Sequence, residues 1–259
     1  MEYTATPDNL TAEAIEGYRE NGFIRIQGLL TPDEAAGMRE AALSLSQRMK
    51  KLSDGPVFTQ LVNAWREDPT IKRLTLNQRL GEVAERLAGV PLRLWHDQLL
   101  IKQPRNNAPT EFHQDQPYWP HANSHHPISA WIALVDVPVE RGCMSFIPRS
   151  HSMRDLPAQN LRDPKSLFSL APDLAWEPRV TLPLRAGDCT FHHGRCAHTA
   201  GSNQTDVPRV AHVVIFMDAV TTYNKKGHVV TDPLNLPDGS PLEGELFPAV
   251  SEFAARVAS

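Results

Sequence analysis

Residues Glu111 to Pro120 contain an imidazole and a carboxylate two positions apart, His113 and Asp115. On an extended strand, residues i and i+2 project from the same face, so these side chains are expected to converge on one point. A second histidine would complete a triad of two histidines and one carboxylate, which leaves coordination positions open for oxygen chemistry on non-haem Fe(II). The pair alone is weak evidence, because a loop histidine beside a solvated aspartate gives the same pattern.

The segment 189–203 offers three candidates for the second histidine, His192, His193 and His198. Arg209 follows in a run that is otherwise mostly Val, Ala, Ile and Phe. A guanidinium among apolar residues is costly unless it is paired, and its fork fits a carboxylate best. A diacid co-substrate would supply that carboxylate. The residues alone leave the choice among the three histidines open.

The elements that position these residues fall into two parts. Thr11 and Thr31 carry helix start signals, Gly22 and Gly89 mark helix ends, and residues 23–26 alternate as a short strand. Beyond Pro91 the chain changes to short β-rich segments separated by Pro, Gly, Asn and Asp turns. These segments span 92–102, 128–137, 144–147, 180–184, 189–191 and 207–216. Many short strands with such turns favour a sandwich or jelly roll over a parallel α/β sheet.

We therefore expect a mainly β protein with flanking helices that forms a single domain over residues 1–259. A helical support region with a short strand would span 1–90, the jelly-roll core 91–218 and a C-terminal extension 219–259, with a short helix near Ser251. Two long polar stretches, 116–127 and 153–178, are expected to be binding loops or lids.

Composition excludes several classes of partner. The formal net charge is -4 and no run of Lys or Arg occurs, which argues against nucleic acid and membrane surfaces as partners. No leader pattern opens the chain, and no apolar stretch approaches the roughly 18 residues that span a bilayer, so we expect a cytoplasmic protein. The three cysteines, Cys143, Cys189 and Cys196, show no CxxC spacing and are expected to be packing residues.

Taken together, these motifs resemble the phytanoyl-CoA dioxygenase family of Fe(II)- and 2-oxoglutarate-dependent oxygenases. That family carries an HxD pair, a distal histidine and an arginine eleven residues after it, which correspond here to His113, Asp115, His198 and Arg209. The segment 131–136 resembles the Trp-bearing strand of the family, and 141–151 resembles its "GC…IPGSH" turn and strand. The resemblance spans about residues 11–218 and implies a double-stranded β-helix, the cupin-like form of the jelly roll.

The resemblance also implies roles for individual residues. His113, Asp115 and His198 would hold the metal as the catalytic centre, with His198 chosen over His192 and His193 because it alone has the arginine at the family's spacing. Fe(II) would bind 2-oxoglutarate and O2, with release of succinate and CO2 and with ascorbate as a supporting reductant in vitro. The residues expected at the co-substrate are Arg209, Thr199, Trp131, Lys102 and Gln98.

Some details depart from the family pattern or stay open. The family often has a hydroxyl two residues after the distal histidine, where this chain has Ala200, so Thr199 or Ser202 would assist Arg209 instead. Asp115 is retained, which favours hydroxylation or another oxidative outcome over the halogenation of related enzymes. The substrate is expected to be a small organic molecule of the secondary-metabolite class, and the residues expected to contact it are Gln116, Tyr118 and Trp119.

The remaining histidines have simpler interpretations. His151 is expected to cap or hydrogen-bond, while His121, His125 and His126 lie in a polar loop and are expected to be solvated. His212 is separated from Arg209 by an odd offset, which places it on the other face of their strand. Two other functions remain open: a metal-binding cupin-like protein or zinc hydrolase that uses the same three ligands, and a non-catalytic family member. A zinc hydrolase needs no diacid clamp such as Arg209, and the intact triad argues against a non-catalytic member.

Overall fold

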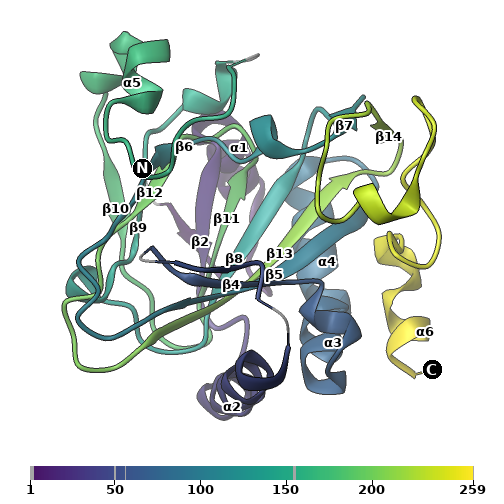
Figure 1. Cartoon of the computed structure of the whole chain (residues 1–259), viewed down its shortest axis with the longest axis horizontal. Helices are drawn as coiled ribbons and strands as arrows, with labels where there is room; N and C mark the ends of the chain where they lie inside the picture. The colour runs from purple at the N-terminus through teal and green to yellow at the C-terminus, as the bar shows by residue number, and fades with distance from the viewer. Residues whose placement is uncertain (1–2, 50, 56, 154–155, 259) are drawn as a thin grey trace.

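Two β-sheets face each other in the computed structural model, and helices cover the outer face of the larger sheet (Figure 1). The structure describes residues 3–49, 51–55, 57–153 and 156–258. Its helices are α1 (Ala12–Asn21), α2 (Pro32–Arg48), α3 (Pro69–Thr75), α4 (Gln78–Ala88), α5 (Ser166–Leu170) and α6 (Phe253–Ala258). Its strands are β1 (Thr4–Ala5), β2 (Phe23–Ile26), β3 (Ser53–Asp54), β4 (Thr59–Val62), β5 (Leu92–Lys102), β6 (Thr110–His113), β7 (His121–Ala122), β8 (Ile128–Ala133), β9 (Met144–Phe146), β10 (Val180–Leu182), β11 (Cys189–His193), β12 (His198–Ala200), β13 (Arg209–Asp218) and β14 (Thr222–Tyr223).

The predicted caps begin and end the N-terminal helices. The Thr11 hydroxyl accepts from a backbone N–H in the first turn of α1, and Thr31 forms a capping box with Glu34 at the start of α2. Gly22 and Gly89 end α1 and α4 in the left-handed conformation, with φ of 84° and 77°. Helix α3 was not predicted, although Pro69 stands in its first turn and the Asp68 carboxylate caps it.

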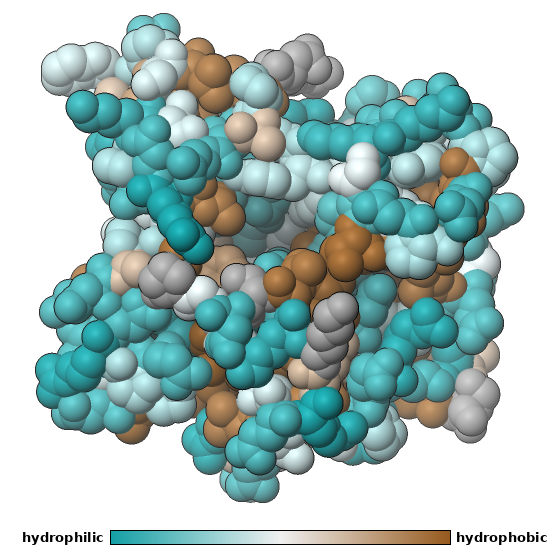
Figure 2. Space-filling view, in the orientation of Figure 1, coloured by the Kyte–Doolittle hydropathy of each residue, from teal (hydrophilic) through white to brown (hydrophobic). Residues whose placement is uncertain are grey.

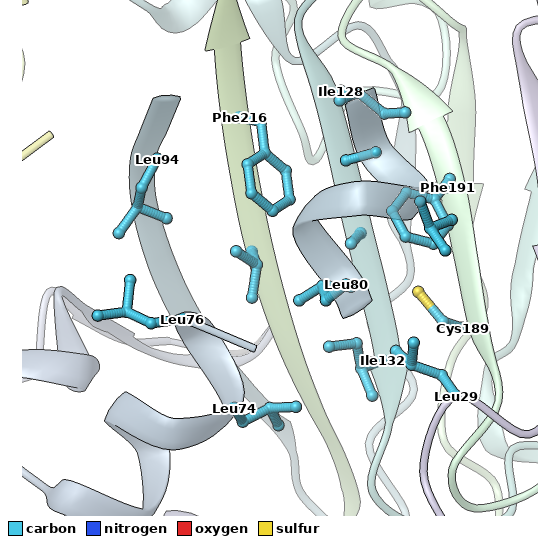
Figure 3. Packing of buried hydrophobic residues seen from close by; sticks show 14 of the residues in the cluster. Leu29, Leu74, Leu76, Leu80, Leu94, Ile128, Ile132, Cys189, Phe191 and Phe216 are labelled. Atoms are coloured by element: carbon cyan, nitrogen blue, oxygen red, sulfur yellow. The ribbon is translucent and has the colours of Figure 1, made fainter. Parts of the chain in front are cut away.

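The larger sheet has the strand order β1-β2-β11-β8-β13-β5-β4-β3 within the described residues. Its outer face packs against α4 and neighbouring helices through a cluster of fully buried apolar side chains (Figure 3). Members of this cluster that Figure 3 labels are Leu80, Leu94, Ile128, Ile132, Phe191 and Phe216. Burial of these side chains stabilises the packing of the helices on the outer face of the sheet.

The smaller sheet has the strand order β10-β9-β12-β6 and lies against the inner face of the larger sheet. The two facing, mostly antiparallel sheets confirm the predicted jelly roll with flanking helices. Figure 1 shows β7 and β14 beside one mouth of this sandwich, and α5 on the other side of it. The predicted loop 153–178 contains α5 and a 3-10 turn at 172–175. The predicted loop 116–127 contains the 3-10 turn η2 (Gln116–Tyr118). Residues 154–155 of the loop 153–178 lie outside the described part of the chain.

Several predicted boundaries shift. Strand β8 ends at Ala133 rather than at 137, and β11 extends to include His192 and His193. The predicted C-terminal helix near Ser251 is confirmed as a 3-10 turn that continues into α6. All three cysteines are free thiols and buried, as expected of packing residues. In the described part of the chain, no helix has the length and apolar character needed to cross a bilayer.

Candidate active site

His113, Asp115 and His198 come together at the edge of the smaller sheet. His113 ends β6, His198 begins β12, and the two residues are direct partners in the antiparallel pair. Their rings lie with centroids 4.3 Å apart. One ligand atom from each of the three side chains lies within 4.8 Å of the others, a spacing that could hold one metal ion.

Asp115 reaches this cluster by a route that differs from the prediction. Strand β6 ends at His113, and Asp115 has a helical backbone, with φ of -78° and ψ of -45°, at the start of η2. Pro117 stands at the beginning of that 3-10 turn, where its fixed φ is favourable. The carboxylate is therefore turned back toward the end of the strand, and the expectation that the pleat of a single strand aligns the two ligands is wrong.

The tautomers of both histidines suit metal binding. Nδ1 of His113 lies 2.7 Å from the Glu111 carbonyl oxygen, and Nδ1 of His198 lies 2.9 Å from the Cys196 carbonyl oxygen. A carbonyl only accepts, so each Nδ1 carries the proton and each Nε2 presents its lone pair. Both Nε2 atoms point at Asp115 Oδ1, at 3.4 Å for His113 and 3.7 Å for His198. The donor set therefore fits a divalent transition metal.

The charge states of the ligands point the same way. Burial would raise the pKa of Asp115, but the neighbouring imidazoles of His198, His113 and His192 outweigh burial and hold the pKa well below its usual range. Burial, followed by His113, lowers the pKa of His198 well below its usual range. A carboxylate and a neutral imidazole are the forms that coordinate a metal, so neither Asp115 nor His198 has to lose a proton at neutral pH.

The other carboxylate oxygen of Asp115 is held by the larger sheet. Ser129 on β8 donates to Asp115 Oδ2 at 3.2 Å, and Nε2 of His192 on β11 lies 3.3 Å from the same oxygen. Ser129 and His192 are direct cross-strand partners, so both side chains point to the same face. Sequence reasoning weighed His192 only as a ligand and did not consider Ser129. The alternation of residues along β11 is the sequence signal that could have predicted His192 on the inner face. The contact between His192 and Asp115 depends on how the two sheets face each other, which that signal does not give.

Arg209 is buried on the inner face, with 1% of its surface exposed. Its Nη1 donates to the Gly142 carbonyl oxygen at 3.1 Å, and its guanidinium lies 5.4 Å from the centre of the Trp131 ring. Its Nε is buried and has no hydrogen-bond partner among the described residues. Burial lowers the pKa of Arg209 to about 10, which still leaves it charged at neutral pH. A buried cation with an unused donor fits the distal carboxylate of a diacid.

A cavity of about 460 Å³ joins the three metal ligands to Arg209. Gln98, Trp131, Tyr118 and Trp119 line it, as the sequence predicted, and Thr110 and His192 line it without having been predicted to. The space-filling view shows this face hollowed between the part that carries α5 and the part that carries β7 and β14 (Figure 2). The volume is in the range of small-molecule binding sites.

Three predicted site residues do not line the cavity. The Thr199 hydroxyl donates to the Thr110 carbonyl oxygen at 2.6 Å, because alternation along β12 turns Thr199 away from the face that carries His198. Lys102 donates to the Ala108 and Gly201 carbonyl oxygens at 2.9 and 2.8 Å. The Gln116 amide donates to the Ser124 carbonyl oxygen at 2.8 Å.

Ser202, the other hydroxyl considered beside Arg209, also lies outside the cavity lining and accepts from the Gln204 side chain. The remaining histidines were mostly interpreted correctly. His125 and His126 are exposed, and His151 bonds to the Arg19 carbonyl oxygen. His212 faces away from the cavity and bonds to Asp97 at 3.0 Å. The prediction that His121 is solvated is wrong, because both of its ring nitrogens are buried and its ring packs edge-on against the Trp95 ring.

Comparison with known proteins gives related matches over most of the chain. The family model described as phytanoyl-CoA dioxygenase (PhyH) matches residues 18–211. The mouse (Mus musculus) phytanoyl-CoA dioxygenase domain-containing protein 1 is 28% identical over 176 residues, which cover 66% of this chain and 60% of that protein. The mouse peroxisomal phytanoyl-CoA dioxygenase is 26% identical over 232 residues, which cover 79% of this chain and 68% of that protein. The chain thus spans less than two thirds of the first relative.

Two solved structures are similar over nearly their whole length. The non-haem α-ketoglutarate-dependent carbocyclase SnoK from nogalamycin biosynthesis is 38% identical, with a TM-score of 0.86 and coverage of 95% of this chain and 98% of that one. The epimerase SnoN, in complex with Fe3+, α-ketoglutarate and nogalamycin RO, is 37% identical, with a TM-score of 0.83 and coverage of 91% and 96%.

Proposed function

The chain belongs to the phytanoyl-CoA dioxygenase family of Fe(II)- and 2-oxoglutarate-dependent oxygenases, and we propose that it oxidises a carbon-hydrogen bond of a small organic metabolite. The observation that carries this proposal is one cavity in which three metal-ligating side chains and a buried, incompletely paired arginine occur together. The triad alone would suit several metals and reactions. The arginine adds a binding site for a dianionic co-substrate.

His113, Asp115 and His198 are the proposed ligands of Fe(II). Bound there, the iron would activate O2 and couple the oxidative decarboxylation of 2-oxoglutarate, to succinate and CO2, to oxidation of the substrate. The carbonyls of Glu111 and Cys196 fix the two imidazoles, while Ser129 and His192 hold the free oxygen of Asp115. Such supporting hydrogen bonds orient ligands and maintain their protonation states.

Arg209 is the proposed clamp for the distal carboxylate of 2-oxoglutarate. Its guanidinium is already oriented by the Gly142 carbonyl and the Trp131 ring, so little side-chain entropy is lost when the carboxylate binds. Thr110 is the hydroxyl that we propose beside it, because Thr110 lines the cavity whereas Thr199 and Ser202 do not.

A substrate from secondary metabolism is supported by the 37 and 38% identities to two enzymes of nogalamycin biosynthesis. Those relatives are a carbocyclase and an epimerase, so removal of a hydrogen atom from carbon need not end in hydroxylation. Tyr118 and Trp119 are the proposed substrate contacts, since both line the cavity beside Asp115. We propose hydroxylation or another oxidative outcome rather than halogenation, because Asp115 occupies the position that halogenases leave vacant for chloride.

A metabolite panel tests this function directly. The protein would be incubated with Fe(II), ascorbate and 2-oxoglutarate, and succinate release and product mass would be measured for each compound. Gain of one oxygen atom indicates hydroxylation, loss of two hydrogens indicates ring closure or desaturation, and an unchanged mass with altered stereochemistry indicates epimerisation. The Asp115→Ala variant is the matched control. Turnover with Zn²⁺ and without succinate would instead support the zinc hydrolase, which needs no clamp such as Arg209.

A further inference from the structure

Two histidines face each other at the end of the cavity that is remote from Arg209. His96 lies on β5, and His228 lies in the segment after β14; both line the cavity. Their ring centroids are 5.5 Å apart, and no hydrogen bond joins the rings. Trp95 packs against both, with centroid distances of 5.5 and 5.1 Å. Neither histidine takes part in the proposed metal centre, and sequence reasoning singled out neither.

Backbone hydrogen bonds fix opposite tautomers in the two rings. Nδ1 of His96 lies 3.1 Å from the Asp97 carbonyl oxygen and must therefore donate, which leaves Nε2 as an acceptor. The Val230 backbone N–H donates to Nδ1 of His228 at 3.2 Å, so the proton of His228 is on Nε2. Neither Nε2 has a hydrogen-bond partner among the described residues. The pair thus presents one acceptor and one donor.

Both rings are held neutral, which keeps this arrangement fixed. Burial, followed by the neighbouring His228, lowers the pKa of His96 to about 3. Burial also lowers the pKa of His228 to about 4, against the opposing effect of Asp232. At neutral pH neither ring carries a charge, so neither attracts a carboxylate or a phosphate.

Sheet register separates this pair from the co-substrate. His96 pairs with Ile215 on β13, Ile215 pairs with Ser129 on β8, and Ser129 pairs with His192 on β11. Two strand spacings of about 4.8 Å therefore place His96 roughly 10 Å from Ser129, which holds Asp115. Arg209 is six residues from Ile215 along β13, or roughly 20 Å of strand. His96 therefore lies level with Ser129 across the sheet and roughly 20 Å of strand from Arg209, so the histidine pair is separate from the proposed 2-oxoglutarate clamp.

We propose that His96 and His228 form a binding site for one neutral hydroxyl group of the substrate, with the hydroxyl donating to His96 Nε2 and accepting from His228 Nε2. This inference rests on the proposed function and adds a chemical feature of its substrate. A hydroxyl combines donor and acceptor on one oxygen, as this pair requires, whereas a ketone or an ether offers only an acceptor. The surrounding aromatic side chains and the distance of roughly 10 Å from Ser129 fit a hydroxyl carried on a ring system.

Three matched probes test the site without knowledge of the natural substrate. The anaerobic enzyme with Fe(II) and 2-oxoglutarate would be titrated with 2-naphthol, 2-methoxynaphthalene and naphthalene, and binding measured by fluorescence. We expect 2-naphthol to bind about five- to 150-fold more tightly than naphthalene, since each of the two hydrogen bonds contributes about 0.5–1.5 kcal/mol. The methoxy compound cannot donate to His96 and should lose most of this preference.

Substitution of each histidine tests whether the pair causes the tighter binding of 2-naphthol. His96→Phe and His228→Phe should each reduce this preference about two- to twelvefold, through loss of one hydrogen bond, whereas His125→Phe, at an exposed histidine that does not line the cavity, should retain it in full. Circular dichroism confirms that each variant is folded, and the probe series on the unmodified protein stands independently of the variants. Equal binding of 2-naphthol and naphthalene, undetectable binding of 2-naphthol, or a preference that is undiminished in both variants would overturn the proposal.

Failure of this inference can be told from failure of the proposed function. The same protein preparation is assayed for succinate released from 2-oxoglutarate in the absence of any substrate. If succinate is released but the hydroxyl preference is absent, only the hydroxyl site is wrong. If no succinate is released with or without the metabolite panel, the oxygenase assignment itself fails, whatever the probes do.

Discussion

Arg209 and Lys102 lie directly opposite each other in β13 and β5, and each donates to the carbonyl of one of two glycines that touch. Arg209 bonds to Gly142 and Lys102 to Gly201, and a Cβ added to Gly142 would lie 2.3 Å from the Gly201 oxygen. Two buried basic side chains therefore lie close together at the end of the cavity that Arg209 lines, and among the described residues neither forms a salt bridge. A dianionic co-substrate would balance this charge.

The first prediction concerns the clamp. Arg209→Lys keeps the positive charge but loses the planar fork, so the apparent affinity for 2-oxoglutarate should fall about ten- to hundredfold. Binding of Fe(II) should stay near normal, because Arg209 contacts none of the three ligands. Isothermal titration with 2-oxoglutarate and a separate iron titration would measure the two effects. Arg162→Lys, at an exposed site, is the control. An unchanged affinity would place the clamp elsewhere, with Lys102 as the next candidate.

The second prediction concerns Lys102 and pH. Burial, followed by Arg209, lowers the pKa of Lys102 to about 7, whereas the unfolded chain has a lysine pKa of about 10.4. Between these values the unfolded state binds more protons, so the contribution of this group to stability should rise with pH from about 7 to 10. Thermal melting of the protein without co-substrate should show this rise, and Lys102→Met should flatten it.

Exposed Lys165→Met is the control and should keep the full pH dependence. Saturating 2-oxoglutarate should weaken the dependence in the unmodified protein, because a nearby dianion favours the charged lysine. Identical pH profiles for Lys102→Met and the unmodified protein would show that Lys102 titrates normally.

The third prediction concerns the metal ligands. His113→Ala, Asp115→Ala and His198→Ala should each abolish Fe(II)-dependent succinate release and strongly weaken iron binding. The fold should persist, because the two sheets are held by large apolar clusters and not by the metal. Iron content and circular dichroism would be measured together, with exposed His125→Ala as the control. Full activity in any one of the three ligand variants would sink the assignment of the site.

Sequence patterns were sufficient to predict the parts of the fold that local chemistry determines. The Thr31 capping box and the terminal glycines Gly22 and Gly89 depend on residues within one turn, and the structure contains all of them. The two histidines and the aspartate were also identified from the sequence and lie together. The turn that directs Asp115 was missed, since the spacing of His113 and Asp115 is compatible with either a strand or a strand end.

Contacts between distant segments could not be predicted. His192 and Ser129 hold Asp115 because β11 and β8 face β6 across the sandwich, and a single sequence carries no signal for that distance. His96 and His228 likewise meet only because the segment after β14 folds over β5. Residue type indicates what each side chain can do, but topology decides which side chains meet.

The fourth prediction separates two threonines. Thr110 and Ala200 are cross-strand partners that line the cavity, whereas the Thr199 hydroxyl points away from it. Thr110→Val should raise the apparent KM for 2-oxoglutarate about ten- to hundredfold, through loss of one hydrogen bond to a charged group. Thr199→Val should leave that KM unchanged and lower only the melting temperature. The opposite pattern in steady-state kinetics would restore Thr199 to the co-substrate site.

The fifth prediction concerns the aromatic pair that follows Asp115. The Tyr118 hydroxyl donates to the Gln159 carbonyl oxygen, and the Gln159 side chain accepts from the Gln114 backbone. These bonds tie η2 to the loop that carries Leu161, another residue of the cavity lining. Tyr118→Phe removes the first bond, so the loop should loosen and the substrate KM should rise about three- to tenfold.

Trp119 acts through volume, because only 6% of it is exposed and its ring lies against Gly194, where an added Cβ would come within 2.8 Å. Trp119→Ala should therefore enlarge the cavity, change the product distribution and destabilise the fold by about 3–5 kcal/mol. Succinate release without substrate should persist in both variants, since the proposed iron ligands and Arg209 remain. The control is Trp176→Ala, which removes an indole that is 90% exposed. Unaltered substrate kinetics and products in both Tyr118→Phe and Trp119→Ala would exclude this pair from substrate selection and turn attention to Leu161 and its loop.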